Sequence, residues 1–292
     1  MAGNTEPLPI VRSVGELRDI VREWRRQGLT VGLVPTMGAL HDGHLTLVRE
    51  AGCRADRVVT SVFVNPTQFA AHEDLGTYPR QEARDAELLT DAGCALMFAP
   101  TVAEMYPDGF VTSVSVGDAA KGGPSQGLEG DFRPQMFGGV AVVVSKLLNQ
   151  VQADVAVFGE KDWQQLMVVR RMAADLDIPT AIVGSPTLRD DHGLALSSRN
   201  AYLSEAELEI ARKLNVILRE AAGQAAAKRP LARIEREAYA AILKAGFDRV
   251  DYVSVRHADT LSAFAHGTVD GPARILVAAV LGRTRLIDNM PV

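Results

Sequence analysis

Residues 31–50, VGLVPTMGALHDGHLTLVRE, decide the predicted fold. Residues 30–35 form a short apolar run rich in β-branched side chains, which predicts a buried strand. Gly38 then allows a tight turn, and the apolar positions 45, 47 and 48 predict a helix running to about Cys53. A strand followed by a glycine turn and a helix start is a geometry that places phosphates against free backbone N–H groups.

Two histidines mark the start of this helix. His41 and His44 are three residues apart and therefore share one helix face, while Gly43 between them lets a nucleotide approach the backbone. Imidazoles at the positive end of a helix dipole can donate to phosphate oxygens and stabilise charge on a leaving pyrophosphate. The alternative is a pair of ordinary polar loop residues, and H-x-G-H alone is a weak signal. Its position directly after a strand and P-T-M-G favours a nucleotide site.

The pattern around this stretch predicts an α/β fold. Helices are predicted over residues 14–28, 81–92 and 140–151, with another carrying Trp163; strands are predicted over 57–64, 95–99, 111–116, 154–158 and 180–183. Alternating strands and helices predict a Rossmann-like, doubly wound parallel sheet with right-handed crossovers.

The alternation of predicted strands and helices stops beyond Pro186. Helices are predicted over residues 204–228, where Ser204 and Glu207 are spaced as a capping box, and over 231–246. Residues 250–256 and 275–287 are strand-like. We therefore expect two domains, residues 1–186 and a smaller α+β domain of residues 187–292.

The composition limits the functional classes. The 292 residues are 47% hydrophobic and carry a net charge of −5, which argues against a nucleic-acid binder. The two cysteines, Cys53 and Cys94, suit a reducing compartment. The polar residues 1–9 do not resemble a secretory signal, and no apolar run is long enough to span a bilayer. A cytoplasmic protein without membrane or nucleic-acid partners is expected.

Two further motifs, G-E-K-D at residues 159–162 and L-S-S-R-N at residues 196–200, suit phosphate binding. The first follows a predicted strand and opens a helix, where a lysine can reach phosphates; on its own it is equally well an acidic helix cap. The second, in the loop after the domain boundary, has hydroxyls and a guanidinium for a triphosphate, although its composition alone favours a plain turn. They consist of Gly159, Glu160, Lys161 and Asp162, and of Leu196, Ser197, Ser198, Arg199 and Asn200.

Neutral amides stand near the carboxyl ends of predicted strands. Asn65 and Gln68 follow residues 57–64, and Gln165 lies in the helix after the G-E-K-D motif. In an open α/β sheet this edge binds ligands. Amides can hold hydroxyls and a carboxylate without placing a charge beside the reacting group. Surface amides that cap element ends are the common alternative.

The run PTMGALHDGHLTLV resembles the pantothenate synthetase (pantoate–β-alanine ligase) family of the H-x-G-H nucleotidyltransferase superfamily. The resemblance extends over nearly the whole chain, through FVNPTQF, YPR, GEKDWQQL, LALSSRNAYL and RLIDN. It implies ATP-dependent condensation of (R)-pantoate with β-alanine through a pantoyl adenylate, with Mg²⁺ accompanying ATP and few or no protein ligands to the metal. It also implies a homodimer and a mobile second domain that acts as a lid.

The resemblance implies roles for individual residues. His44 and His41, with Lys161 and Arg199, are expected to be catalytic. Pantoate would contact Gln68, Gln165, Met37 and Asn65, and β-alanine would contact Gln68. ATP would contact Pro35, Met37, Gly38, His41, Gly43, His44, Gly159, Glu160, Lys161, Asp162, Leu188, Leu196, Ser197, Ser198 and Arg199.

One position departs from the family pattern. The segment Leu128-Glu129-Gly130 followed by Arg133-Pro134-Gln135-Met136-Phe137 resembles the family's L-E-G-x-x-R-P-x-H-F, but Met136 replaces the histidine. A thioether cannot donate to a phosphate. Met136 leaves open a regulatory nucleotide-binding protein that has lost catalysis. The H-x-G-H signature leaves open a nucleotidyltransferase with a phosphorylated small-molecule acceptor, which would need a basic acceptor-phosphate site in place of Gln68 and Gln165.

Overall fold

The computed structural model describes residues 7–70, 74–117 and 122–292. The chain divides into two compact units. The first contains Met1–Ser115, Gln135–Gly159 and Val169–Ser185, and the second contains Val116–Pro134, Glu160–Val168 and Pro186–Val292. The predicted boundary after residue 186 falls at the start of the last segment of the second unit, which also takes two earlier segments.

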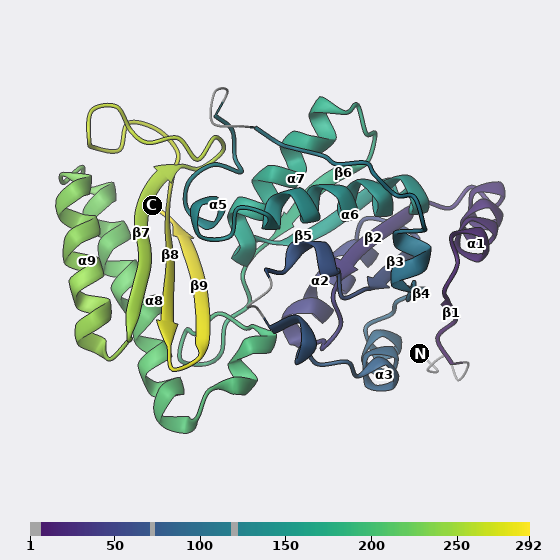
Figure 1. The fold of residues 1–292 in the computed structure, drawn as a ribbon, viewed down its shortest axis with the longest axis horizontal. Helices are drawn as coiled ribbons and strands as arrows, with labels where there is room; N and C mark the ends of the chain where they lie inside the picture. Colours follow the sequence, from purple (N-terminus) through teal and green to yellow (C-terminus); the bar gives the residue numbers. More distant parts are fainter. Residues whose placement is uncertain (1–6, 71–73, 118–121) are drawn as a thin grey trace. The chain divides into compact units, whose positions relative to one another are not determined.

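The first unit is built on a parallel sheet, which among the described residues has six strands in the order β1-β4-β3-β2-β5-β6 (Figure 1). The bounds are β1 Ile10–Val11, β2 Val31–Thr36, β3 Arg57–Val62, β4 Leu96–Phe98, β5 Val155–Gly159 and β6 Ala181–Ser185. The central strands are apolar and buried, as expected for a sheet covered on both faces. The predicted doubly wound α/β fold is confirmed.

Helices cover both faces of this sheet. Right-handed crossovers place α2 (Asp42–Gly52) and α3 (Glu82–Asp91) on one face, and α1 (Val14–Arg26) and α6 (Met136–Val151) on the other. The packing of α1 on α6 and of α2 on α3 agrees with this assignment. α7 (Trp163–Asp175) begins in the second unit and continues in the first.

The strand order reverses at β2. From β2 the chain proceeds to β3 and β4 on one side, and it returns through α6 to β5 and β6 on the other. β2 and β5 are paired, with Gly32 opposite Val155 and Leu33 opposite Ala156. In such sheets ligands bind outside the carboxyl ends of the strands at the reversal. The H-x-G-H segment follows β2 at this point, and β5 ends there at Gly159.

Some elements differ from the prediction. The strand predicted over residues 111–116 is wrong: the backbone there forms no strand, and the Val111 side chain is 92% exposed. Alternating valines therefore did not indicate a half-buried strand here. Three short elements escaped the sequence pattern, namely β1, α4 (Val102–Met105) and α5 (Glu129–Phe132).

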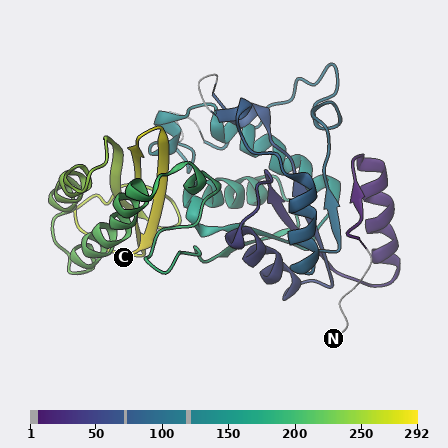
Figure 2. The ribbon, with the colours of Figure 1, turned by 90° about the horizontal axis from the view of Figure 1, so that it is seen from below.

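The second unit contains an antiparallel sheet of β7 (Arg249–His257), β8 (Ala273–Leu281) and β9 (Thr284–Pro291) in that order. The strand-like character predicted for residues 275–287 is confirmed, but the run is divided between two strands, β8 and β9. Gly282, with φ +57°, turns the chain between β8 and β9. The helices α8 (Glu205–Ala226) and α9 (Leu231–Ala245) lie side by side (Figure 2). Ser204 and Glu207 form the predicted capping box of α8.

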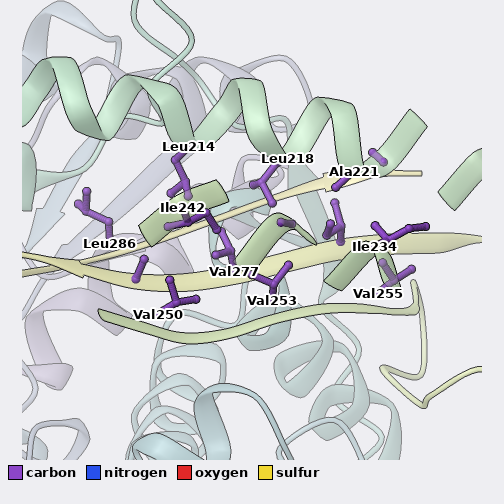
Figure 3. Packing of buried hydrophobic residues seen from close by; sticks show 14 of the residues in the cluster. Leu214, Leu218, Ala221, Ile234, Ile242, Val250, Val253, Val255, Val277 and Leu286 are labelled. Atoms are coloured by element: carbon purple, nitrogen blue, oxygen red, sulfur yellow. The ribbon is translucent and has the colours of Figure 1, made fainter. Parts of the chain in front are cut away.

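The two faces of this sheet differ in chemistry. On one face, side chains of α8 and α9 such as Leu218 and Ile242 pack against Val253, Val277 and Leu286 of the strands (Figure 3). Because strand side chains alternate between faces, Arg274, Arg285 and other polar residues point the other way. This second face bonds the segments Val116–Pro134 and Glu160–Val168, which explains why both belong to this unit.

In the described part of the chain, no helix is both long and apolar enough to cross a membrane.

Candidate active site

The turn after β2 is held in an unusual backbone conformation. Gly38 has φ +80° and Ala39 has φ +50°. A Cβ at Gly38 would lie 3.0 Å from Asp85 Oδ2 and 3.1 Å from Val62, so the turn requires glycine on both steric and conformational grounds. Thr36 ends β2 by donating from Oγ1 to the Ser61 carbonyl at 2.7 Å.

Asp85 of α3 fixes this turn. Its carboxylate is 1% exposed and accepts the N–H groups of Ala39 at 3.0 Å and Leu40 at 2.9 Å. Burial raises the pKa of the Asp85 carboxyl, and the two backbone donors oppose that shift. Nothing in the charged run around α3 distinguishes Asp85 from its exposed neighbours, so the sequence did not indicate its role.

The two histidines cap α2 reciprocally. His41 is the N-cap; its Nδ1 accepts the Gly43 N–H at 3.1 Å, while His44 Nδ1 accepts the His41 N–H at 3.4 Å. The ring centroids are 4.1 Å apart. Since each Nδ1 is an acceptor, each neutral ring carries its hydrogen on Nε2 and is a donor from that atom. The backbone at the helix start therefore sets the tautomer that phosphate binding requires.

A second group of predicted residues in the first unit centres on Gln68. Gln68 Nε2 donates to Met37 Sδ at 3.1 Å, which joins the turn after β2 to the 3₁₀ segment Pro66–Gln68 after β3. Asn65 Nδ2 donates to Gln68 Oε1 at 3.0 Å and to the Gly139 carbonyl at 3.2 Å. This contact needs glycine, because a Cβ at Gly139 would lie 2.4 Å from the Thr67 carbonyl oxygen.

Asn65 is fully engaged within the protein. It is 1% exposed, and its Oδ1 accepts from Tyr106 Oη at 2.7 Å and from Thr67 Oγ1 at 2.9 Å. With both amide hydrogens also donated, its side chain orients Gln68. The structure thus brings together Pro35, Met37, Gly38, His41, Gly43, His44, Asn65 and Gln68 in the first unit, with Gly159 at the end of β5.

The remaining predicted residues belong to the second unit. Glu160, Lys161 and Asp162 form a 3₁₀ turn directly before α7. Lys161 Nζ lies 3.6 Å from Asp162 Oδ2, and the Lys161 side chain is 18% exposed. Asn289 of β9 donates from Nδ2 to the carbonyls of Glu160 at 3.0 Å and Lys161 at 2.8 Å.

The LSSRN loop is ordered by its own backbone. Ser197 caps the 3₁₀ segment Ser198–Tyr202, and its Oγ accepts the Arg199 N–H at 3.3 Å, so its hydroxyl hydrogen is still a donor. The Leu196 N–H bonds the Leu188 carbonyl at 2.9 Å. This bond connects Leu188, which is expected to contact ATP, with the loop expected near the phosphates.

Neighbouring glutamines of α7 have different surroundings. Gln164 is 3% exposed; its Oε1 accepts the Glu129 N–H, and its Nε2 donates to the carbonyls of Pro124 and Gly127, all at 3.0 Å. Gln165 is only partly buried. Gln164 is therefore a structural residue that anchors residues 124–129, and Gln165 is the better placed of the pair for a ligand.

The sequence analysis also missed a buried charge cluster. Glu129 accepts two hydrogen bonds from Arg285, each 2.7 Å long, and one from Tyr252 Oη at 2.8 Å. Burial, followed by the Glu129 charge, raises the pKa of Tyr252 well above its usual range. The motifs around Glu129 and Arg285 were visible in the sequence, but their pairing across 156 residues was not.

Among the residues that the structure describes, no group of three or more His, Cys, Asp or Glu side chains is arranged to hold a metal ion.

Met136 is the first residue of α6 and is 6% exposed.

The strand order of the parallel sheet reverses at β2, and two imidazoles cap the helix that begins there. This arrangement is typical of the nucleotide-binding α/β class of proteins. The model of the pantoate–β-alanine ligase family matches residues 9–291, and the chain belongs to that family.

Relatives and solved structures agree with this assignment. The chain is 57% identical over 289 residues to pantothenate synthetase of Caulobacter vibrioides, covering 99% of each chain, and 56% identical to that of Mesorhizobium japonicum, covering 97% of each. The crystal structure of pantothenate synthetase from Thermus thermophilus superposes with a TM-score of 0.87 at 45% identity, covering 97% of this chain and 99% of that one. Pantoate–β-alanine ligase from Francisella tularensis, complexed with β-γ ATP and β-alanine, gives a TM-score of 0.80 at 33% identity and 97% coverage of each chain.

Proposed function

We propose that this protein condenses (R)-pantoate with β-alanine in an ATP-dependent reaction, releasing AMP and pyrophosphate. The carrying observation is the family match along residues 9–291, on which every motif quoted above stands in order. In the first step a pantoate carboxylate oxygen attacks the α-phosphorus of ATP and pyrophosphate leaves. In the second step the amine of β-alanine attacks the acyl carbon of pantoyl adenylate, and AMP leaves.

In this proposal the residues of the first unit bind pantoate and stabilise developing charge. His44 and His41 donate from Nε2 to phosphate oxygens, with the helix start beneath them. Gln68 binds pantoate and then β-alanine, and its contact with Met37 and Asn65 fixes its orientation. Neutral amides suit this task because a charged group beside the attacking carboxylate would alter its nucleophilicity.

The residues of the second unit bind the nucleotide. Lys161 and Arg199 neutralise the triphosphate, and the Ser197 and Ser198 hydroxyls donate to its oxygens. Gln165 binds pantoate, and the Leu188 backbone contacts adenine. No nucleophilic side chain is needed, because the adenylate is itself the activated species; catalysis consists of positioning and charge stabilisation.

Mg²⁺ would accompany ATP. In this proposal the ion has few or no protein ligands and is held mainly by phosphate oxygens and water. Asp162, with a side chain 40% exposed, is the carboxylate beside Lys161. The ion would supply neutralisation of phosphate charge. A homodimer in the cytoplasm is part of the proposal, and light scattering and cell fractionation test it.

The reaction is tested by following both leaving groups. ATP and pantoate alone should release a single-turnover amount of pyrophosphate, and adding β-alanine should give continuous AMP production. ATP binding without pyrophosphate release would refute the proposal in favour of a regulatory nucleotide-binding protein. Turnover only with a phosphorylated acceptor would refute it in favour of another nucleotidyltransferase.

A further inference from the structure

Two consecutive side chains of β9 bond the G-E-K-D loop and the segment that precedes the LSSRN loop: Asn289 bonds the carbonyls of Glu160 and Lys161, and Asp288 bonds Arg189. Asp288 and Asn289 are 4% and 3% exposed, and because successive strand residues alternate, they point to opposite faces of the sheet. They belong to the RLIDN motif, for which neither the sequence analysis nor the proposed reaction supplies a role.

The Asn289 side chain uses both of its amide hydrogens and its oxygen in hydrogen bonds. Its two amide hydrogens go to the carbonyls of Glu160 and Lys161 at 3.0 and 2.8 Å, and its Oδ1 accepts from Arg274 Nε. Two consecutive carbonyls held by one rigid amide fix the direction in which the Lys161 side chain leaves the loop.

Arg274 reinforces this arrangement. Its guanidinium lies 3.6 Å from the centroid of the Trp163 ring and donates to Glu160 Oε2 at 3.0 Å. Trp163 in turn donates from Nε1 to the Ala258 carbonyl at 2.8 Å. The G-E-K-D loop is therefore held through its backbone, its acidic side chain and the first residue of the following helix.

Asp288 acts on the other loop. It accepts from both terminal nitrogens of Arg189, at 2.7 and 2.8 Å, and Arg189 also donates to the Gly193 carbonyl at 3.1 Å. Arg189 follows Leu188 and pairs with Ala195 in an isolated β-bridge, directly before the LSSRN loop. The Asn289 N–H bonds Asp288 Oδ1 at 2.7 Å and links the two systems.

We infer that Asn289 is a positioning residue for ATP, holding the G-E-K-D backbone so that Lys161 meets the triphosphate, and that Asp288 does the same for the LSSRN loop through Arg189. This inference rests on the proposed function. β9 bonds two backbone carbonyls and the Arg189 guanidinium, none of which is a reacting group. Because these bonds position the loops that are proposed to bind ATP, their loss should weaken nucleotide binding.

The test is Asn289→Asp, which keeps the shape of the side chain and the acceptor for Arg274 but replaces both donors with oxygen facing two carbonyls. We expect KM for ATP to rise at least about tenfold, while KM for β-alanine stays within about twofold of wild type. Asp288→Asn, which retains one acceptor for Arg189, should raise KM for ATP by a smaller factor. The matched control is Val255→Ala, a buried change on the helix-covered face of the same sheet, on β7 and away from Asp288 and Asn289; it should lower Tm without changing either KM.

Each outcome decides the inference. If Asn289→Asp folds and both of its KM values match those of Val255→Ala, β9 has only a structural role and the inference is overturned. If Asn289→Asp does not fold, Arg274→Lys replaces it, since lysine keeps the charge but cannot bond Asn289 and Glu160 together as the guanidinium does; a wild-type KM for ATP in that variant overturns the inference. Failure of the proposed function is distinguishable, because the wild-type protein would then show no pyrophosphate release with ATP and pantoate.

Discussion

The histidine turn after β2 and the G-E-K-D loop after β5 are held in different ways. The histidines that follow the turn cap the start of α2 within three positions, and Asp85 of α3, 45 residues after Leu40, accepts from the turn backbone. The loop is held by Asn289, 129 residues after Glu160, and by Arg274, 114 residues after it. The turn thus depends on a local histidine cap and on α3 of its own unit, while the G-E-K-D loop depends on strands more than a hundred residues away.

Because the two regions are held differently, substitutions in them should have different effects on rate, nucleotide binding and stability. Groups on the turn are fixed as soon as α2 and the sheet form, so substitutions there should change rate more than stability. The loop and its neighbour, the LSSRN segment, depend on buried polar contacts with β9, so substitutions there should change nucleotide binding and stability together.

The largest effect is expected for His44→Ala. Removing a preorganised donor to the developing phosphate charge should lower kcat of adenylate formation by about a hundredfold or more. Pyrophosphate release in the first half-reaction measures this effect. His266→Ala, which changes an exposed histidine of the second unit, is the control and should leave the rate unchanged. A near wild-type rate for His44→Ala would remove the turn from the mechanism.

Arg189→Ala should give the next largest effect. It leaves the buried Asp288 carboxylate without its bidentate partner, which should cost about 2–4 kcal/mol in the free energy of unfolding. Denaturant unfolding measures the loss, and KM for ATP should rise in the same variant. Arg189→Lys, which keeps the charge without the fork, should fall between wild type and Arg189→Ala; equal stability of all three would show that Asp288 does not depend on this pair.

The contrast between the two regions also explains what the sequence could predict. The strand, glycine turn, histidine pair and capping box were predictable because their determinants lie within a few residues of each other. Glu129 with Arg285, and Asn289 with the G-E-K-D carbonyls, were not, since hydrogen-bonding partners more than a hundred residues apart leave no periodic signal. Asn65 shows a third case: its position at the end of a strand was predicted, but its complete internal bonding was visible only in three dimensions.

Asp85→Asn tests the support that α3 gives the turn, through its pH dependence. Because burial raises the pKa of Asp85, the folded protein binds this proton more tightly than the unfolded chain does. The contribution of the carboxyl to stability is therefore full below the unfolded pKa of about 3.9 and is lost as the pH rises through the folded pKa.

The variant does not titrate at this position. The stability of wild type minus that of Asp85→Asn should therefore fall as the pH rises from about 4 through the raised folded pKa, and should be constant above it. Urea unfolding of both proteins across this range measures the difference, in which most other titrating groups cancel. A difference that increases with pH would mean that the backbone donors of Ala39 and Leu40 outweigh burial. The rate should fall by about tenfold or less, because one of the two acceptors is retained.

Met136→His should have the smallest effect on activity. It tests whether this chain needs the imidazole donor that the family motif has at this position. We expect activity equal to or above that of wild type, since the change restores a hydrogen-bond donor at the start of α6. Because Met136 is buried, the polar ring should cost stability, about 1 kcal/mol or somewhat more. Steady-state kinetics and thermal unfolding of the same preparation separate the two effects. A severe loss of activity would show that the methionine has its own packing role, and that this chain has adapted its core to the loss of the histidine.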